Sequence, residues 1–193
     1  MSAEQRMINK KTKKRNRLIF RSIVLAVLLV ALIYAVVSNL TKENTNVDVG
    51  DEAPDFVLNQ INKNNELEKI QFSNLEGKGV MLNFWGTWCE PCEAEMPFMQ
   101  KLYPEYKKKG VEIVTVNLDA SKFVVHQFVD KYDLTFPVLY DAKDQVMNLY
   151  NVGPIPSSFF ISPEGEIVEV VEGALTLEKL EGYLKQIQPE QQS

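Results

Sequence analysis

A run of fifteen apolar residues at positions 23–37 divides this chain of 193 residues into two unequal parts. Leu18, Ile19 and Phe20 lengthen the run, and a helix over residues 18–38 would be about 31 Å long. Because the hydrocarbon core of a bilayer is roughly 30 Å thick, the run predicts a transmembrane signal-anchor helix over residues 18–38. A buried core helix fits poorly, since the run is wholly apolar and dense charge precedes it.

Charge is distributed unevenly along the chain, although the formal net charge is only −5. Residues 1–21 carry eight Lys or Arg and one acid, whereas the remainder carries thirteen Lys, twenty-five acids and no Arg. The positive-inside rule therefore predicts that residues 1–21 are a cytoplasmic basic segment and that everything after about residue 40 is extracytoplasmic. The acidic body argues against nucleic acid as a partner.

A cleaved signal peptide would share the basic front and the apolar run, and this alternative stays open. No clear small-x-small cleavage site follows the run, where Val36 with Ser38 is the nearest match. An uncleaved single span is therefore favoured. Residues 39–52 are polar and aperiodic, which is typical of a tether, and residues 53–190 form the expected extracytoplasmic domain.

The pattern of residues 53–190 predicts an α/β domain, in which a mixed β-sheet is flanked by helices. Short strands at 56–58 and 67–72, joined by a polar turn at 62–65, predict an N-terminal β-hairpin extension. Apolar or β-branched runs predict further strands at 80–84, 111–117, 136–140, 158–161 and 167–171. Helical spacing predicts helices at 89–109, 121–132, 144–150 and 177–187.

Two details of these helices are predicted as well. Pro97 lies inside the first pattern and indicates a kink rather than an end, and Gly110 follows a run of lysines at the expected end. Ser121 is in position to cap the second helix.

Both cysteines of the chain lie in the sequence Cys89-Glu90-Pro91-Cys92, after a predicted buried strand and at the start of a predicted helix. The first turn of a helix offers unpaired N–H groups and the positive end of the dipole, and both stabilise a thiolate. Cys92 lies three residues on, on the same helical face, so the pair can close and reopen a disulfide. We expect Cys89 to attack a substrate disulfide and Cys92 to resolve the mixed disulfide.

Other uses of a cysteine pair are less favoured here. Half of a metal site or a passive disulfide would need only the two cysteines, but the strand–CxxC–helix context favours redox chemistry. Haem attachment needs a His directly after the second cysteine, where Glu93 stands. One His and two Cys do not complete a four-ligand zinc site without carboxylates, so we expect no metal.

Several motifs together resemble the thioredoxin family: the sequence FWGTWCEPC at 84–92, Pro97, and GPIPS at 153–157. The likeness runs from about residue 49 to 187, and the Trp-Cys-Glu-Pro-Cys version, the anchor and the front strands resemble the ResA-type branch. The resemblance implies a thioredoxin-like fold and a cis peptide bond at Ile155–Pro156. In the family this loop faces the CxxC, keeps metals from the thiols and offers backbone groups to an extended substrate.

The resemblance also implies a function: a membrane-anchored thiol–disulfide oxidoreductase of cytochrome c maturation. Such a protein reduces the CxxCH disulfide of apocytochrome c before haem attachment, with electrons from a membrane thiol carrier. No flavin, nicotinamide or metal cofactor is implied, and we expect a monomer.

Two residues depart from the general family pattern. Thioredoxins often carry a buried Asp where this chain has Asn83, which cannot titrate. Glu95 lies three residues past Cys92, and branch members resemble this spacing, so we hypothesise that Glu95 exchanges protons with Cys92. The alternative is a solvated surface carboxylate.

Glu90 lies between the cysteines, and its negative charge opposes thiolate formation. A less stabilised dithiolate makes a better reductant, so we expect a potential near the roughly −270 mV of thioredoxin rather than the roughly −120 mV of a strong oxidant. Glu90 is also simply a good residue for the first turn of a helix. Trp88 is expected to offer apolar contact to substrate and Trp85 to lie in the core, while His126 falls off the apolar face and should be exposed.

Three alternatives to apocytochrome c reduction remain. A spore-envelope or general extracytoplasmic thiol reductase would share every motif. A peroxiredoxin would explain the front segment APDF at 53–56, but it needs a Thr-x-x-Cys and a downstream Arg. Here Thr87 is only two residues before Cys89 and no Arg follows Arg21. A non-enzymatic thioredoxin-like binding module would not need the intact CxxC.

Overall fold

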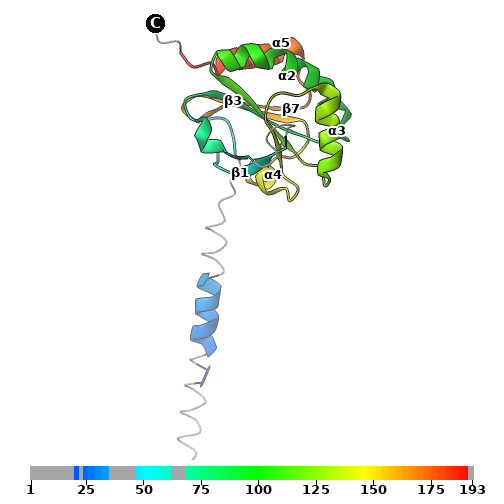
Figure 1. Ribbon diagram of the computed structural model, residues 1–193. Coiled ribbons are helices and arrows are strands. Elements are labelled where there is room, and N and C mark those ends of the chain that lie inside the picture. Colours follow the sequence, from blue (N-terminus) through cyan, green and yellow to red (C-terminus); the bar gives the residue numbers. More distant parts are fainter. Residues whose placement is uncertain (1–19, 22–23, 35–46, 62–67, 191–193) are drawn as a thin grey trace, which may run out of the picture. The chain divides into compact units, whose positions relative to one another are not determined.

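A computed structural model of the protein describes residues 20–21, 24–34, 47–61 and 68–190 (Figure 1). The chain divides into two compact units, Met1–Asn44 and Thr45–Ser193. In the first unit, the described residues 24–34 are helical and exposed. Among the described residues, no helix is both long and apolar enough to cross a bilayer. The predicted span, residues 18–38, extends beyond the described helix on both sides, and most of the predicted basic segment and tether also lies outside the described residues.

The second unit is built on a mixed seven-stranded sheet with the strand order β2-β1-β5-β4-β3-β6-β7. The three central strands β5, β4 and β3 are parallel, and the other pairings are antiparallel. The strands are β1 Val57–Gln60, β2 Lys69–Gln71, β3 Gly79–Trp85, β4 Val111–Asn117, β5 Val138–Tyr140, β6 Ser157–Ile161 and β7 Ile167–Glu172. The predicted mixed sheet is therefore confirmed.

Helices cover both faces of this sheet. The helical elements are η1 Phe72–Leu75, α2 Glu90–Lys108, α3 Lys122–Tyr132, α4 Gln145–Leu149 and α5 Leu177–Gln186. Side chains alternate along a strand, so Met81 and Trp85 of β3 face one core, with α2, α3 and α5. Leu82 and Phe84 face the opposite core, with η1 and α4. Helices α2 and α5 lie side by side (Figure 1).

The N-terminal hairpin is present, but its second strand is shorter than predicted. β1 pairs with β2 and also with β5, which joins the hairpin to the main sheet. Residue 72 does not continue β2, because the Phe72 ring stacks on Phe56 at 5.2 Å. The carboxylate of Asp55 also accepts the Ser73 N–H at 2.8 Å, which turns the chain into η1. The predicted turn at 62–65 lies outside the described residues.

Most other boundaries agree with the predictions to within two residues. β5 begins at Val138 rather than at residue 136, and Pro137 in between has no N–H to donate to a strand ladder. Helix α2 continues through Pro97 and Pro104, and Gly110 beyond its end has a φ of +82°. Ser121 holds the cap position of α3, but its side chain makes no capping hydrogen bond.

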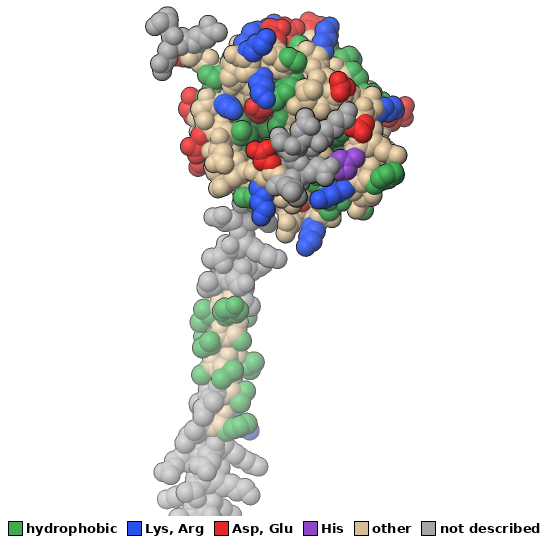
Figure 2. Space-filling model, viewed as in Figure 1, with side chains coloured by type: hydrophobic (Ala, Val, Ile, Leu, Met, Phe, Trp, Pro, Cys, Tyr) green, Lys and Arg blue, Asp and Glu red, His purple; other side chains and the backbone are tan. Residues whose placement is uncertain are grey.

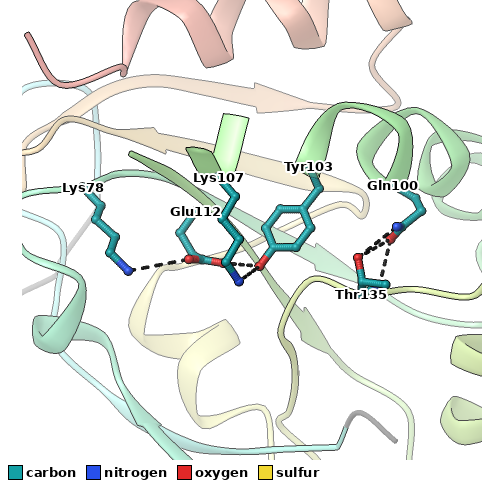
Figure 3. Close-up of polar contacts among 6 residues, drawn as sticks. All are labelled: Lys78, Gln100, Tyr103, Lys107, Glu112 and Thr135. Carbon is teal, nitrogen blue, oxygen red and sulfur yellow. Dashed lines mark hydrogen bonds and ion pairs between the residues drawn. The ribbon is translucent and has the colours of Figure 1, made fainter. Parts of the chain in front are cut away.

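Two polar clusters fasten the body of α2, one to strand β4 and one to the loop before β5 (Figure 3). The carboxylate of Glu112 on β4 is 5% exposed and accepts a hydrogen bond from the Tyr103 hydroxyl. The ammonium groups of Lys78 and Lys107 lie 3.7 and 3.8 Å from this carboxylate. Further along, the Gln100 side chain and Thr135 exchange hydrogen bonds of 2.8 and 2.9 Å. These contacts hold the body of α2 against β4 and against the loop before β5.

The surface of this unit carries both signs of charge. On the face seen in Figure 2, Lys side chains are interspersed with Asp and Glu.

Candidate functional site

Cys89 and Cys92 form a disulfide at the start of α2, with their Cα atoms 5.2 Å apart. Cys89 is the N-cap residue, and its Sγ accepts the Cys92 N–H at 3.3 Å. Cys89 is 6% exposed and Cys92 is fully buried. The outer sulfur therefore sits where the N–H groups of the first turn would stabilise a thiolate after reduction, as predicted from the sequence.

The loop before β6 faces this disulfide from a distant part of the chain. The Ile155–Pro156 peptide bond is cis, as the resemblance implies. The carbonyl oxygen of Ile155 lies 3.7 Å from the Sγ of Cys89. The outer sulfur is thus flanked by the backbone of the loop before β6.

Glu95 lies on the buried face of α2 and is only 1% exposed, so its interpretation as a solvated surface carboxylate is wrong. Its Oε1 accepts a hydrogen bond from Asn83 Nδ2 at 2.8 Å, and its Oε2 accepts one from the Leu175 N–H at 3.1 Å. Burial raises the pKa of Glu95 to about 7, against the opposing effect of these two hydrogen bonds. The group can therefore gain or lose a proton near neutral pH.

Asn83, on β3, also links Glu95 to strand β6. Its Nδ2 also donates to the Ser158 hydroxyl on β6 at 3.0 Å. The sequence showed only that Asn83 cannot titrate, whereas the structure makes it the hydrogen-bond donor of the carboxylate that does. Its Oδ1 is buried and has no hydrogen-bond partner among the described residues.

The acids in the first turn of α2 differ in their surroundings. Glu90 is exposed beside the disulfide. Glu93 accepts hydrogen bonds from the Lys131 ammonium, at 2.8 Å, and from the Tyr132 hydroxyl, both on α3. These two donors hold the pKa of the Glu93 carboxyl below its usual value. Glu90 is thus left as the acid facing solvent at the mouth of the site.

Trp85 lies in the core as predicted, whereas the expected contact of Trp88 with substrate stays a prediction. Trp88 is 69% exposed next to Cys89, whereas Trp85 is fully buried and packs on Phe128, with ring centroids 4.7 Å apart. The exposure predicted for His126 is wrong in degree, because the residue is half-buried. It lies one residue from Val125 and three from Val129, at the margin of the apolar face of α3.

One residue of this site escaped the sequence analysis. The carboxylate of Asp119, in the loop between β4 and α3, accepts hydrogen bonds from Thr87 just before the CxxC. Loops that follow neighbouring parallel strands meet at the same sheet edge, and the parallel pairing of β3 with β4 is what brings Asp119 to Thr87. Among the described residues, no group of three or more His, Cys, Asp or Glu is placed to hold a metal.

Comparison with known proteins places this geometry in context. The family model of the AhpC/TSA family matches residues 49–170. A ResA thiol-disulfide oxidoreductase of Oceanobacillus iheyensis is 57% identical over 191 residues, covering 99% of this chain and 100% of that protein. A protein of the same name from Geobacillus kaustophilus is 48% identical over 177 residues, covering 92% and 99%.

Solved structures with the same fold include thiol–disulfide proteins. One described as the thiol:disulfide interchange protein DsbE of Chlorobium tepidum is 34% identical, with a TM-score of 0.67, covering 72% of this chain and 97% of that one. StoA of Bacillus subtilis is also 34% identical, with a TM-score of 0.59, covering 67% and 96%.

Proposed function

This chain belongs to the AhpC/TSA family and is a thiol–disulfide oxidoreductase of the ResA group, and from that premise we propose that it reduces protein disulfides outside the cytoplasmic membrane. The observation that carries the proposal is the environment of Cys89. Its sulfur caps the active-site helix, lies at the surface end of the cysteine pair and faces the cis-proline loop.

The reaction starts from the reduced pair. The Cys89 thiolate attacks one sulfur of the substrate disulfide, which forms a mixed disulfide and releases the first substrate thiolate. Cys92 then attacks the Cys89 sulfur, which releases the second substrate thiolate and leaves the Cys89–Cys92 disulfide seen here. Two electrons pass to the substrate. Glu95, with a pKa of about 7, takes the proton that Cys92 must lose.

Membrane anchoring through residues 18–38, with the N-terminus in the cytoplasm, is part of the proposal. The fifteen-residue apolar run and the basic segment before it support this topology. Within the domain, the Gly50 N–H donates a hydrogen bond to the Ile167 carbonyl oxygen, and the Ala53 N–H donates one to that of Gly165. Both lie at the sheet edge where β3 begins. Cys89 follows the opposite end of β3, so the domain is joined to its tether at the far edge from the disulfide.

We propose the CxxCH disulfide of apocytochrome c as the substrate and a membrane thiol carrier as the electron donor. The resemblance to the ResA-type branch supports both, and an extracytoplasmic reductant needs a continuous supply of electrons. The alternative is a spore-envelope or general extracytoplasmic thiol reductase, which would use the same cysteines on other disulfides.

We do not propose peroxide reduction, although a peroxiredoxin would explain the front segment at 53–56. The chain lacks the Thr-x-x-Cys arrangement and has no Arg after Arg21. A non-enzymatic binding module is also not proposed, because the cysteine pair is intact and forms a disulfide.

The test uses the full-length protein in detergent. Its redox potential is measured by equilibration with dithiothreitol, and a value well below the roughly −180 mV of protein disulfide isomerase is expected. A value above that level would make the protein an oxidase or isomerase. The reduced protein is then mixed with a CxxCH peptide whose cysteines form a disulfide and with native insulin, whose disulfides are intact. Preference for the peptide supports the cytochrome substrate, and equal rates favour the general reductase.

A further inference from the structure

The four residues that lead into the cysteine pair form a tight turn. The Cys89 N–H donates to the Gly86 carbonyl oxygen at 3.1 Å, which is the hydrogen bond of a β-turn from Gly86 to Cys89. Thr87 and Trp88 are the two central residues of this turn. The direction of the Trp88 side chain therefore depends on how this turn is held, whereas Cys89 is also held as the N-cap of α2.

A buried carboxylate from another loop holds it. The Oδ2 of Asp119 accepts the Thr87 N–H at 2.8 Å, and its Oδ1 accepts the Thr87 hydroxyl at 2.7 Å. Asn117 completes the arrangement, because its Nδ2 donates to Asp119 Oδ2 at 2.7 Å and its Oδ1 accepts the Asp119 N–H at 3.0 Å. Both oxygens of the carboxylate are thus used.

The burial of Asp119 indicates a dedicated role. The residue is only 6% exposed, and among the described residues no Lys or His forms an ion pair with it. A buried carboxylate is costly unless hydrogen bonds replace its water. Here the donors are two groups of one residue in the active-site turn and one amide at the end of β4, and hydrogen bonds to an ionised acceptor are the stronger kind.

The turn Gly86–Cys89 also positions the aromatic ring of Trp88. The Trp88 indole lies directly over Gly86, where a Cβ atom would stand 2.7 Å from the indole Nε1 and 2.8 Å from Cε2. Any larger residue at position 86 would push the indole away. The ring is 69% exposed, so this contact with Gly86 sets its orientation without burying it.

We propose that Asp119 is a positioning residue for protein-disulfide reduction: it fixes the turn Gly86–Cys89 and so presents the Trp88 indole to the protein substrate beside Cys89. This inference rests on the proposed reduction of protein disulfides. A small disulfide needs only the Cys89 sulfur, whereas a protein disulfide must also dock on the surface around it. Loss of Asp119 should therefore impair the protein substrate selectively.

Two substitutions of Asp119 separate hydrogen bonding from charge. Asp119→Ala removes every contact to Thr87. Asp119→Asn keeps them, because its amide oxygen can accept from the Thr87 N–H and Asn117, and its NH2 can donate to the Thr87 hydroxyl. Thr87→Val removes only the hydrogen bond from the Thr87 hydroxyl to Asp119, so its effect should be smaller than that of Asp119→Ala. Gly86→Ala displaces the indole without touching the carboxylate, and Gly182→Ala, with open space around it on α5, is the matched control.

The experiment compares insulin reduction, with dithiothreitol as the electron source, with the reaction of the reduced protein with the small disulfide DTNB. In full-length Asp119→Ala, kcat/KM for insulin should fall roughly tenfold, mainly through KM, while the DTNB rate stays within about twofold. Gly86→Ala should behave similarly, and Asp119→Asn and Gly182→Ala should resemble the wild type. Equal loss on both substrates, no loss in Asp119→Ala, or equal damage from Asp119→Asn would overturn the proposal.

Fluorescence supplies a readout that does not depend on activity. The chain has two Trp residues, and Trp85 is fully buried, so quenching by iodide reports Trp88. Quenching of the Trp88 fluorescence by iodide should increase in Asp119→Ala and Thr87→Val but not in Asp119→Asn. The fast decay of its fluorescence anisotropy, which reports motion of the ring, should increase in the same two variants. Unchanged fluorescence in Asp119→Ala would also overturn the assignment. Failure of the wild-type protein to reduce insulin would instead count against the proposed function. The fluorescence comparison would still test whether Asp119 holds the turn Gly86–Cys89.

Discussion

The Asn83 side chain donates a 2.8 Å hydrogen bond to the Glu95 carboxylate at a depth where both residues are within 1% of full burial. This bond connects the central strand β3 to the active-site helix α2, just behind the cysteine pair. An amide donor stabilises the carboxylate but does not titrate in its place. The proton exchange at this depth is therefore left to Glu95, whose pKa of about 7 suits it to accept a proton and to return it.

The first prediction concerns the pH dependence of catalysis. Insulin reduction by the wild-type protein should accelerate as the pH rises through about 7, because Glu95 then becomes the carboxylate that accepts a proton from Cys92. Glu95→Gln should lose this inflection and slow by on the order of 10²-fold. The measurement is kcat/KM over roughly pH 5.5 to 8.5, the range around that pKa. Glu93→Gln is the control, and an inflection near 7 that survived in Glu95→Gln would exclude the role.

The second prediction concerns stability and follows from the same pKa. The folded state holds the Glu95 proton more tightly than the unfolded state, whose pKa is near 4.5. Between pH 4.5 and about 7 the folded protein therefore binds more protons, and its stability falls as the pH rises through this window. The loss should reach roughly 3 kcal/mol and then level off above pH 7.

Urea unfolding of the oxidised full-length protein at roughly pH 5 and pH 8, one near the acid end of the window and one above it, measures most of this effect. Glu95→Gln cannot ionise, so its stability should change less between the two conditions than that of the wild type. All other titrating groups are shared by the two proteins and cancel in the difference. Parallel pH profiles for the two proteins would show that Glu95 does not carry the shift.

The strands and the redox role of the cysteine pair can be predicted well from the sequence, because each depends on a short stretch of neighbouring residues. The β-branched run at 111–117 and the apolar run at 80–84 are each readable within a few residues, and β4 and β3 follow them closely. The apolar pattern at 136–140 predicts a start of β5 that is two residues too early. The pattern reflects only side-chain polarity and not the missing backbone N–H of Pro137.

The partners of the site were harder to predict, because they depend on which strands become neighbours. Thr87 and Asp119 are 32 residues apart in sequence, and Asn83 and Ser158 are 75 apart. Each pair meets only because β3 lies between β4 and β6 in the sheet. Periodicity defines each strand but not that order, so Glu95 could be proposed from its spacing to Cys92 while its hydrogen-bond donors could not.

The third prediction tests how Glu90 tunes the disulfide. Its exposed charge beside the outer cysteine disfavours the thiolate, so Glu90→His should stabilise the reduced form and raise the redox potential. A change of about 1.4 kcal/mol in this balance corresponds to about 30 mV. Equilibration with dithiothreitol or glutathione gives the value. Glu178→His, in the first turn of α5, is the matched control, and an equal shift there would point to a general charge effect instead.

The last prediction concerns the clamp that holds the far end of α2. Glu112 is nearly buried, and its carboxylate binds the Tyr103 hydroxyl and lies within 4 Å of two lysines (Figure 3). Glu112→Ala leaves the hydroxyl without its acceptor and should destabilise the fold by about 2–4 kcal/mol. Tyr103→Phe removes only the hydroxyl and should cost about 1 kcal/mol.

Because the two residues share one hydrogen bond, the double variant should be less destabilised than the sum of the single variants. Urea unfolding of the four proteins gives this coupling. The clamp lies at the opposite end of α2 from the disulfide, so the variants that fold should retain the wild-type redox potential. A changed potential would mean that the axis of α2, and not only its first turn, tunes the cysteine pair.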